Sequence, residues 1–501
     1  MFARRPRLLP LSPAALLLVW AAAGAAAELE GVVLDNLSGR PLARAQISLE
    51  MIQGGASAPL PSVLSDSRGR FAFHALPAGA YLLSARRAGY LTARYGQRRW
   101  DGAGAPLVLD AEARFFAQLR LRRLGVITGQ VLDENQLGLA GHSVYAYRAA
   151  PPPLRVAAAA VSDDRGVYRI IGLEPGRYYV RTGPRQLEDG RGLLPTFYGQ
   201  SAALGQARPV DAELDRETGG VDIEPLAGRL ARLAGRVLGG PATVTLYSEA
   251  GRREIVTGAD GAFQFEELAP GPYQLLALTH AERPRAAWLR LTLSEGGAET
   301  TLAPVRLPSL SVRCQEKSGL RADPAKVTVF LRRVEPPEGE TLRLEGGESV
   351  ALTPGEYQAA AVAAPEYYIE SLRLPRAGAL PGRFEALPAD NLELTVVLGS
   401  RPAGLSGRVL DAEGKPVPGA PVFLSAVDPA LRTLLEGGRS TRADQHGEYR
   451  FYGLPPGRYR LLSSFDIARP EESDWDAPGG AETSLEEGRA ARLDLKLAGG
   501  L

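Results

Sequence analysis

The sequence contains very little cysteine and histidine, and this scarcity excludes several kinds of site. It has one cysteine, Cys314, and four histidines in 501 residues. An intrachain disulfide is impossible, so the fold must be stabilised by packed apolar cores. The histidines lie far apart at His74, His142, His280 and His446, and none begins a His-x-x-Glu pattern. The sequence therefore predicts no zinc-hydrolase site, no other metal site and no cofactor.

Other signatures of catalysis are missing as well. There is no Gly-x-Ser-x-Gly nucleophile turn and no phosphate-binding loop. Cys314 lies in a strand-like segment without a histidine partner in its own repeat, so we expect a small buried apolar residue. The acid pairs at 471–472 and 486–487 are explained most simply as solvated loop residues rather than glycosidase carboxylates. We therefore predict no catalytic residue and no enzyme activity.

Net charge and long apolar runs are also scarce. The net charge is +1, and the main apolar run, at residues 14–23, follows three arginines near the N-terminus. An Ala-x-Ala site ends at Ala27, so residues 1–27 are interpreted as a signal peptide, with a retained membrane anchor as the alternative. Cleavage would change the net charge to about −2. We expect an exported protein, in the periplasm, at the cell surface or outside, with no further membrane span and no nucleic-acid partner.

Glycine and proline, in contrast, are abundant, with 57 and 39 residues, and many occupy one repeated turn. The turn reads Leu-x-Pro-Gly-x-Tyr, and a second glycine precedes its leucine by seven positions. The first copy has its proline one place early, and a fifth copy at 352–357 lacks the upstream glycine. Proline fixes φ and glycine accepts positive φ, so each copy predicts a tight connection between two strands. The turn residues are Gly79 and Tyr81, Gly176 and Tyr178, Gly271 and Tyr273, and Gly457 and Tyr459, and the upstream glycines are Gly69, Gly166, Gly261 and Gly447.

The residues around each turn indicate what it connects. Phe71 and Phe73 before the first turn, and Tyr81 and Leu83 after it, show the spacing of two that is typical of strands. The repeated tyrosine is expected to be a core residue whose hydroxyl finds a backbone acceptor. Three copies begin with an aspartate that we expect to cap an Asx-type turn; a calcium loop, the alternative, needs more oxygen ligands than each copy supplies. These aspartates are Asp66, Asp163 and Asp444.

A second motif opens the repeats. The strand-like sequence Gly-x-Val-Leu occurs four times, with its glycine at residues 31, 129, 235 and 407. Period-two alternation dominates and no long amphipathic helix is found, so we predict an all-β protein of tandem antiparallel β-sandwiches, of the kind seen in immunoglobulin-like domains. Each unit is large enough to bury its own core, so we expect domains in a row rather than a solenoid. The predicted domains are 28–124, 125–228, 229–306 (short), 307–400 (divergent) and 401–501.

These motifs carry a resemblance to a known family. The order G-x-V-x-D, G-x-P-L-x-x-A-x-V, D-x-x-G-x-F/Y-x-F/I and L-x-P-G-x-Y resembles the carboxypeptidase regulatory-like domain, most clearly at 28–124, 125–228 and 401–501. The resemblance implies a transthyretin-like sandwich, grouped with carbohydrate-binding-like folds, as in tandem-repeat exported proteins of Gram-negative soil bacteria. It also implies a domain that accompanies an enzyme without being the catalyst.

The sequence predicts a non-catalytic binding or scaffold module, with an unknown surface protein or a glycan as partner. An alternative is carbohydrate binding through aromatic residues in loops, and a remote alternative is the accessory region of a hydrolase system. The opposing explanation for the aromatics is that each caps the end of its sandwich. The candidate ligand-contacting residues are Tyr95, Trp100, Phe197, Tyr198, Trp288 and Trp475.

Overall fold

The structure, a computed structural model, describes residues 26–53, 56–150, 154–188, 190–249, 251–336, 341–374, 382–435, 438–476 and 478–499. Strands dominate, which confirms the predicted all-β fold. None of the described helices has the length and apolar character that crossing a membrane requires. The predicted signal peptide lies outside the described residues except for its last two. The helical segments are short: α1 (Pro429–Leu434) and the 3₁₀ turns η1 (Leu204–Gln206), η2 (Pro324–Lys326) and η3 (Glu472–Asp476).

Each sandwich has one sheet that contains a parallel pair of strands. In four of them the central strand of this sheet contains the glycine of the Gly-x-Val-Leu motif. It pairs antiparallel with the strand before the Pro-Gly turn and parallel with a strand near the end of the repeat. The fourth keeps a parallel pair without the motif. The strands of these sheets are β1 (Ala27–Asp35), β5 (Arg70–Leu76) and β9 (Arg114–Leu121); β10 (Gly125–Gln130), β13 (Val167–Leu173) and β18 (Glu217–Thr218); β20 (Ala231–Val237), β23 (Ala262–Leu268) and β26 (Ala298–Leu302); β28 (Ser309–Glu316), β31 (Ser349–Ala351), β33 (Tyr368–Arg373) and β35 (Asn391–Gly399); and β36 (Ala403–Leu410), β39 (Glu448–Leu454), β42 (Ala490–Arg492) and β43 (Leu495–Lys496).

A second sheet, in which every strand pair is antiparallel, packs against the first, and the second sandwich has an additional three-stranded sheet of β15 (Arg185–Gln186), β16 (Gly192–Leu193) and β19 (Ala227–Gly228). The strands of these antiparallel sheets are β2 (Gln46–Gln53), β3 (Ala56–Pro59), β4 (Val63–Leu64), β6 (Gly79–Arg86), β7 (Ala93–Arg94) and β8 (Leu107–Leu109); β11 (Ser143–Arg148), β12 (Val156–Val161), β14 (Gly176–Thr182) and β17 (Val210–Ala212); β21 (Ala242–Ser248), β22 (Gly251–Val256), β24 (Gly271–Thr279), β25 (Arg285–Leu293) and β27 (Val305–Arg306); β29 (Val327–Glu335), β30 (Leu342–Glu345), β32 (Gly355–Ala363) and β34 (Arg383–Ala386); and β37 (Pro421–Ala426), β38 (Arg439–Arg442), β40 (Gly457–Ser463) and β41 (Ala481–Leu485).

Each pair of sheets encloses its own apolar core. Among the described residues, the five largest core clusters fall within 27–121, 127–223, 231–302, 310–398 and 403–495. The buried residues of each cluster lie inside one predicted domain, with one exception. Ala27 is buried in β1 one residue before the predicted start of the first domain. Cys314 is buried in the fourth core as expected, and this burial raises the pKa of its thiol. The exact domain boundaries remain predictions.

The turn tyrosines anchor each hairpin to its core by one repeated hydrogen bond. In all five copies the hydroxyl donates to the backbone carbonyl four residues earlier, so the polar end of a mostly buried ring is satisfied. This bond also fixes the turn relative to the strand that follows it. The pairs are Tyr81 with Pro77 (2.6 Å), Tyr178 with Glu174 (2.9 Å), Tyr273 with Ala269 (2.8 Å), Tyr357 with Thr353 (2.7 Å) and Tyr459 with Pro455 (2.8 Å).

The glycine of the opening motif is required by close packing rather than by a turn. In β36, a Cβ on Gly407 would overlap the carbonyl oxygen of Leu493 and lie 3.0 Å from the ring of Tyr449. The hydroxyl of Tyr449 donates to that same carbonyl at 2.6 Å. The aromatic ring of Tyr449 therefore crosses directly over Gly407. The equivalent glycines of the first three sandwiches, at residues 31, 129 and 235, are equally crowded.

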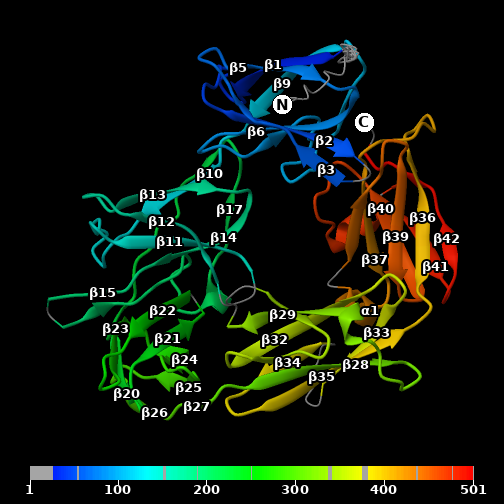
Figure 1. Cartoon of the computed structure of the whole chain (residues 1–501). Coiled ribbons are helices and arrows are strands. Elements are labelled where there is room, and N and C mark those ends of the chain that lie inside the picture. The colour runs from blue at the N-terminus through cyan, green and yellow to red at the C-terminus, as the bar shows by residue number, and fades with distance from the viewer. Residues whose placement is uncertain are drawn as a thin grey trace, which may run out of the picture.

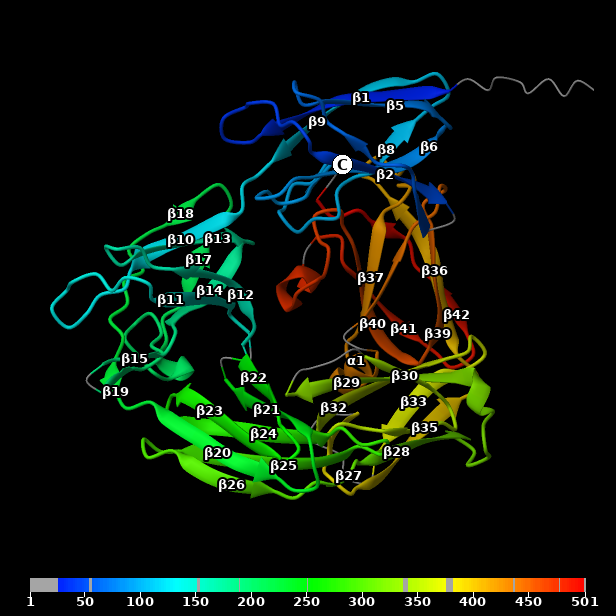
Figure 2. The same cartoon turned by 60° about the vertical axis from the view of Figure 1, so that its left-hand side comes forward.

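The five sandwiches follow one another around a ring, and the fifth returns to the first (Figure 1). The turned view shows the same closure, with the strands β36 to β41 below β2 and β6 (Figure 2). The backbone N–H of Ala103 donates to the carbonyl of Phe465 at 2.8 Å, which joins the two sandwiches directly. The expectation of domains in a row misses this closure, because the residues that make it lie outside the repeated motifs.

The packing around Gly407 predicts a position-specific effect of an added methyl group. We expect Gly407→Ala to destabilise the fifth sandwich by about 3 kcal/mol, because overpacked cores shift backbone and rings. Native-state hydrogen exchange on the full chain should show the loss in the amides of β36, β39 and β40.

Gly404→Ala, in the same strand, is the matched control. The nearest heavy atom to its Cβ would be 3.8 Å away, so the free energy of unfolding should change by less than about 1 kcal/mol. Equal effects of the two substitutions would contradict the packing argument.

Candidate functional site

A cleft of about 750 Å³ lies where the first sandwich meets the fifth. Its walls come from residues 91–100 and 105–106, which include β7, from residues 118–120 of β9 together with Arg122, and from Phe465 and Asp466 of the fifth sandwich. The volume is within the range of small-molecule and oligomer binding sites. We therefore treat this cleft as the candidate binding site.

The loop that forms one wall is held at several points. The N–H of Tyr95 donates to the carbonyl of Leu83 at 2.9 Å, and the N–H of Ala105 donates to the carbonyl of Tyr95 at 2.8 Å. Within the loop, the side chain of Gln97 accepts from the N–H of Arg94 at 3.0 Å and donates to the carbonyl of Trp100 at 2.7 Å. These bonds give the wall a defined shape before any ligand binds.

The fifth sandwich completes the cleft through polar contacts. Arg99 forms ion pairs with Asp101 of its own loop (3.3 Å) and with Asp474 of the fifth sandwich (3.1 Å). The guanidinium of Arg98 donates to the carbonyl of Gly499. Because Phe465 and Asp466 line the cleft, it exists in this form only while the terminal sandwiches are in contact.

The cleft is lined by five arginines and one carboxylate, that of Asp466. Arg99 and Arg122 have acidic partners, the second being paired with Asp215 at 2.9 Å. Within the described part of the chain, the three other arginines of the cleft make no ion pair with an acid. The cleft therefore has an excess of positive charge that can attract and orient an anionic group. These arginines are Arg94, Arg98 and Arg120.

Two of the predicted aromatic contacts, Tyr95 and Trp100, lie in this cleft. Trp100 is 36% exposed, so part of its indole is free to contact a ligand. Tyr95 is half-buried and packs edge-on against Phe115, with the ring centroids 5.8 Å apart. The loop thus brings one partly open aromatic surface beside the arginines that lack acidic partners.

Phe197 belongs to a small apolar cluster with Tyr147 and Leu154, separate from the main core of the second sandwich, whereas Tyr198 packs against that core. Phe197 is 0% exposed and lies beneath the guanidinium of Arg181, which is 4.9 Å from its ring centroid. Tyr198 is half-buried against the second core. Phe197 therefore offers no exposed surface for the predicted ligand contact in this structure, because its ring is buried in this small cluster.

Trp288 and Trp475 lie at joints between sandwiches. Trp288, on β25, is 5.9 Å from the guanidinium of Arg333 in the fourth sandwich, and Arg333 is 8% exposed. Trp475 packs on a small cluster of the fifth sandwich, with the guanidinium of Arg460 5.1 Å from its ring. Its neighbour Asp474 binds the first sandwich. Both tryptophans therefore support inter-domain or edge packing rather than lining the cleft.

The aspartates of the repeated turns cap backbone groups. Each carboxylate accepts two N–H groups from the turn that follows, at 2.7–2.9 Å. In the third copy, where the aspartate is absent, Asp260 accepts one such bond at 3.2 Å instead. The backbone hydrogen bonds hold the pKa of two of these carboxyls below the ordinary value. The capping aspartates are Asp66, Asp163 and Asp444, of which the first two have lowered pKa values.

The four histidines lie apart, in four different sandwiches. His142 is buried and its Nε2 lies 3.1 Å from the carbonyl of Gly183; burial lowers its pKa. Among the described residues, no group of three or more histidine, cysteine or acidic side chains is placed to hold a metal ion.

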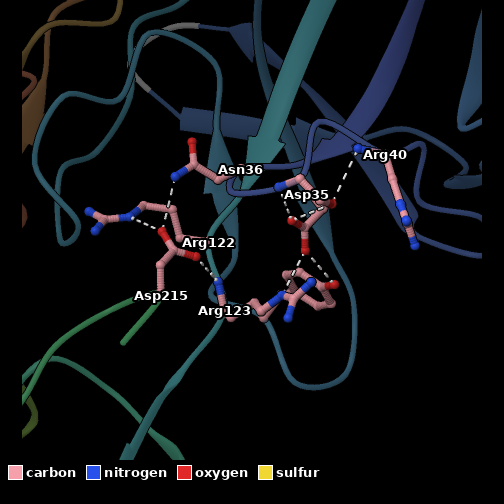
Figure 3. A network of polar contacts seen from close by, with 8 residues as sticks. Asp35, Asn36, Arg40, Arg122, Arg123 and Asp215 are labelled. Atoms are coloured by element: carbon pink, nitrogen blue, oxygen red, sulfur yellow. Dashed lines mark hydrogen bonds and ion pairs between the residues drawn. The ribbon is translucent and has the colours of Figure 1, made fainter. Parts of the chain in front are cut away.

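A polar cluster fixes the joint between the first and second sandwiches, at the edge of the cleft (Figure 3). Asp215 of the second sandwich accepts from the Nε of Arg122 at 2.9 Å and from the side chain of Asn36 at 3.0 Å. It also accepts from the backbone N–H of Arg123 at 2.7 Å. Since Arg122 lines the cleft, this joint holds one of its walls.

The adjoining carboxylate, Asp35, is 1% exposed. Burial alone would raise the pKa of Asp35, but hydrogen bonds from the backbone and hydroxyl of Ser38, the guanidinium of Arg123 and the hydroxyl of Tyr90 hold it well below its usual range. The motif Gly-x-Val-Leu-Asp contains this residue, but its partner Arg123 carries no recognisable sequence signal.

The arginines of the cleft are the functional residues that the sequence reasoning missed. Two of them flank the Tyr95-Gly-Gln97 stretch, at Arg94 and Arg98. Arg120 alternates with buried Leu119 and Leu121 on β9, so the outward face of this strand is polar. The period-two pattern of that strand could have identified Arg120, whereas its proximity to the 94–98 loop depends on the fold.

The fold is a chain of β-sandwiches with a cleft between the first and the fifth. Residues 28–111 and 404–498 match the family model of the carboxypeptidase regulatory-like domain. The chain therefore carries two copies of this domain, in the two sandwiches that form the cleft. The origin in Gram-negative soil bacteria remains a prediction. No curated protein matches the chain.

Several solved structures with some likeness are pilins or pilus proteins by their titles. The Bacillus anthracis TIE protein is 13% identical, with 75% of this chain and 74% of that chain covered and a TM-score of 0.18. The minor pilin GBS52 of Streptococcus agalactiae is 16% identical, with 40% and 95% covered and a TM-score of 0.25. The RrgB pilus protein of Streptococcus pneumoniae is 8% identical, with 95% and 98% covered and a TM-score of 0.16. Likeness at this level carries no argument about function.

The joint at Asp35 leads to a prediction with a defined pH dependence. Asp35→Asn should destabilise the first sandwich by about 1.5–3 kcal/mol at neutral pH, because hydrogen bonds to a charged group are lost. The folded-state pKa is lowered, so this contribution is present above the unfolded-state value of about 4 and declines as the pH falls below it.

Urea unfolding at neutral pH and near pH 3, with hydrogen exchange of β1 and β9, measures the difference between wild type and variant. Asp110→Asn is the control, since Asp110 is exposed. A gap between wild type and Asp35→Asn that stays constant or widens on acidification would refute the assigned pKa direction.

Proposed function

We propose that the chain is an exported, non-catalytic binding module of the cell surface that holds its partner in the cleft between its first and fifth sandwiches. The observation that carries this proposal is the cleft itself, where three arginines with no acidic partner in the described part of the chain line the same walls as a partly exposed tryptophan. The cleft is shaped by hydrogen bonds within the loop and across the joint. A preformed site of this kind binds without a large ordering cost.

The chemistry of the lining supports binding rather than catalysis. The residues that line the cleft include no histidine and no cysteine, and Asp466 is the single carboxylate among them. A general base close to a nucleophile, or a pair of carboxylates flanking a bond, is what hydrolysis would require. The remote alternative, an accessory region of a hydrolase system, finds support only in the family resemblance.

Carbohydrate binding is the second candidate function. Of the six aromatic residues proposed from the sequence, Tyr95 and Trp100 are the two that lie together in a cleft. Aromatic rings beside polar groups suit the alternating faces and edges of sugars.

A blocking substitution tests whether the cleft binds a partner. Gln118 is exposed on β9 and lines the cleft, so Gln118→Trp should fill it. Gln264→Trp, at an exposed position on β23 of the third sandwich, is the matched control. The immobilised full chain should retain a component of the exported or cell-surface fraction, and the blocking variant alone should lose it. Retention by all three proteins alike, or by none, would refute the proposed site.

A further inference from the structure

We propose that the ligand of this cleft is an acidic polysaccharide, a polymer with carboxylates on its sugar rings. This inference rests on the proposed function and names the chemical class of its ligand. It follows from three features of the lining, which are the excess of guanidinium groups, the aromatic surface beside them and the position of the cleft between two sandwiches.

The charges select an anionic ligand. Arg94 and Arg98 use one donor each on backbone carbonyls, of Gly102 (3.3 Å) and Gly499 respectively, and Arg120 faces the side-chain amide of Gln118. Each guanidinium has five N–H donors in a planar fork, so each keeps donors for a ligand. Such forks match carboxylate oxygens in pairs.

The aromatic surface selects a sugar over an acidic peptide. Trp100, which is partly exposed, lines the same cleft as the three arginines, and Thr92 lines it as well. Apolar sugar faces stack on indole rings, while carboxylates and hydroxyls at the ring edge meet donors. An acidic peptide would use the same guanidinium groups but leave the indole without a matching ring.

The placement of the cleft favours a polymer. Its walls come from segments far apart in sequence, residues 91–122 of the first sandwich and 465–466 of the fifth, so it lies between two domains. Arginines stand on two of its walls, on the 94–98 loop and on β9. Repeating carboxylates along a chain can meet both walls at once. The carboxylate of Asp466 repels anionic groups. It should therefore disfavour ligand carboxylates at the end of the cleft that the fifth sandwich forms.

Binding of the full-length chain to defined polymers tests the proposal. The probes are polygalacturonate, neutral pullulan and polyglutamate, which carries the same charged group without sugar rings. Polygalacturonate should bind, pullulan should not, and polyglutamate should bind about tenfold more weakly or less. Raising the salt from about 50 to about 500 mM should weaken the binding, because exposed charge pairs are screened.

Two sets of variants locate the site. Arg94→Gln, Arg98→Gln and Arg120→Gln combined, and separately Trp100→Ala, should each lower the affinity for polygalacturonate by about tenfold or more. The matched control removes an equal number of positive charges at exposed positions outside the cleft. It combines Arg40→Gln, Arg44→Gln and Arg283→Gln. Hydrogen exchange verifies that every variant is folded.

The outcomes separate the ligand class from the function. If polyglutamate binds as tightly as polygalacturonate, or if Trp100→Ala has no effect, the assignment of a polysaccharide ligand is wrong. The ligand would then be an acidic protein segment. Equal losses in the two triple variants would overturn the site. If no polymer binds while the Gln118→Trp variant still loses its surface partner, the ligand class is wrong and the proposed function stands.

Discussion

The joints between the sandwiches are the constraint on which the cleft depends. A sandwich with its own core can turn freely relative to its neighbours unless their contacts are specific. In this chain an arginine is found at several joints, such as Arg122 with Asp215 and Arg99 with Asp474. Guanidinium groups suit this role because they remain charged at all relevant pH values and bind carboxylates in a fixed geometry. Positioned in this way, the two terminal sandwiches form a site that neither contains alone.

The sequence contained enough information to predict the single sandwich, but not the closed ring that the five sandwiches form. The motif around Gly407 and Tyr459 encodes local geometry, a crowded strand and a bonded turn, so its repetition predicted the hairpins and the all-β class. The parallel pairing of β1 with β9 leaves no such mark, because alternation with period two is the same in both directions. Ring closure depends on isolated contacts such as Ala103 with Phe465, which no repeat contains.

The candidate site was predictable in part for the same reason. Aromatic residues in loops are conspicuous, so Tyr95 and Trp100 could be named from the sequence. Phe197 had the same appearance but is covered by Arg181, and burial of a loop residue depends on what the tertiary structure places above it. The arginines at 94, 98 and 120 were overlooked because exposed arginines are common, and they become distinctive only because they share one cleft and form no ion pair with an acid among the described residues.

The parallel pair of strands in each sandwich also determines how the sandwich would carry tension. In the first sandwich β1 enters and β9 leaves, side by side and pointing the same way along eight paired positions. A pull on the chain from both sides therefore draws these strands past each other lengthwise. Their hydrogen bonds then bear the load together in shear rather than opening one after another, which is the arrangement suited to a tether under mechanical force.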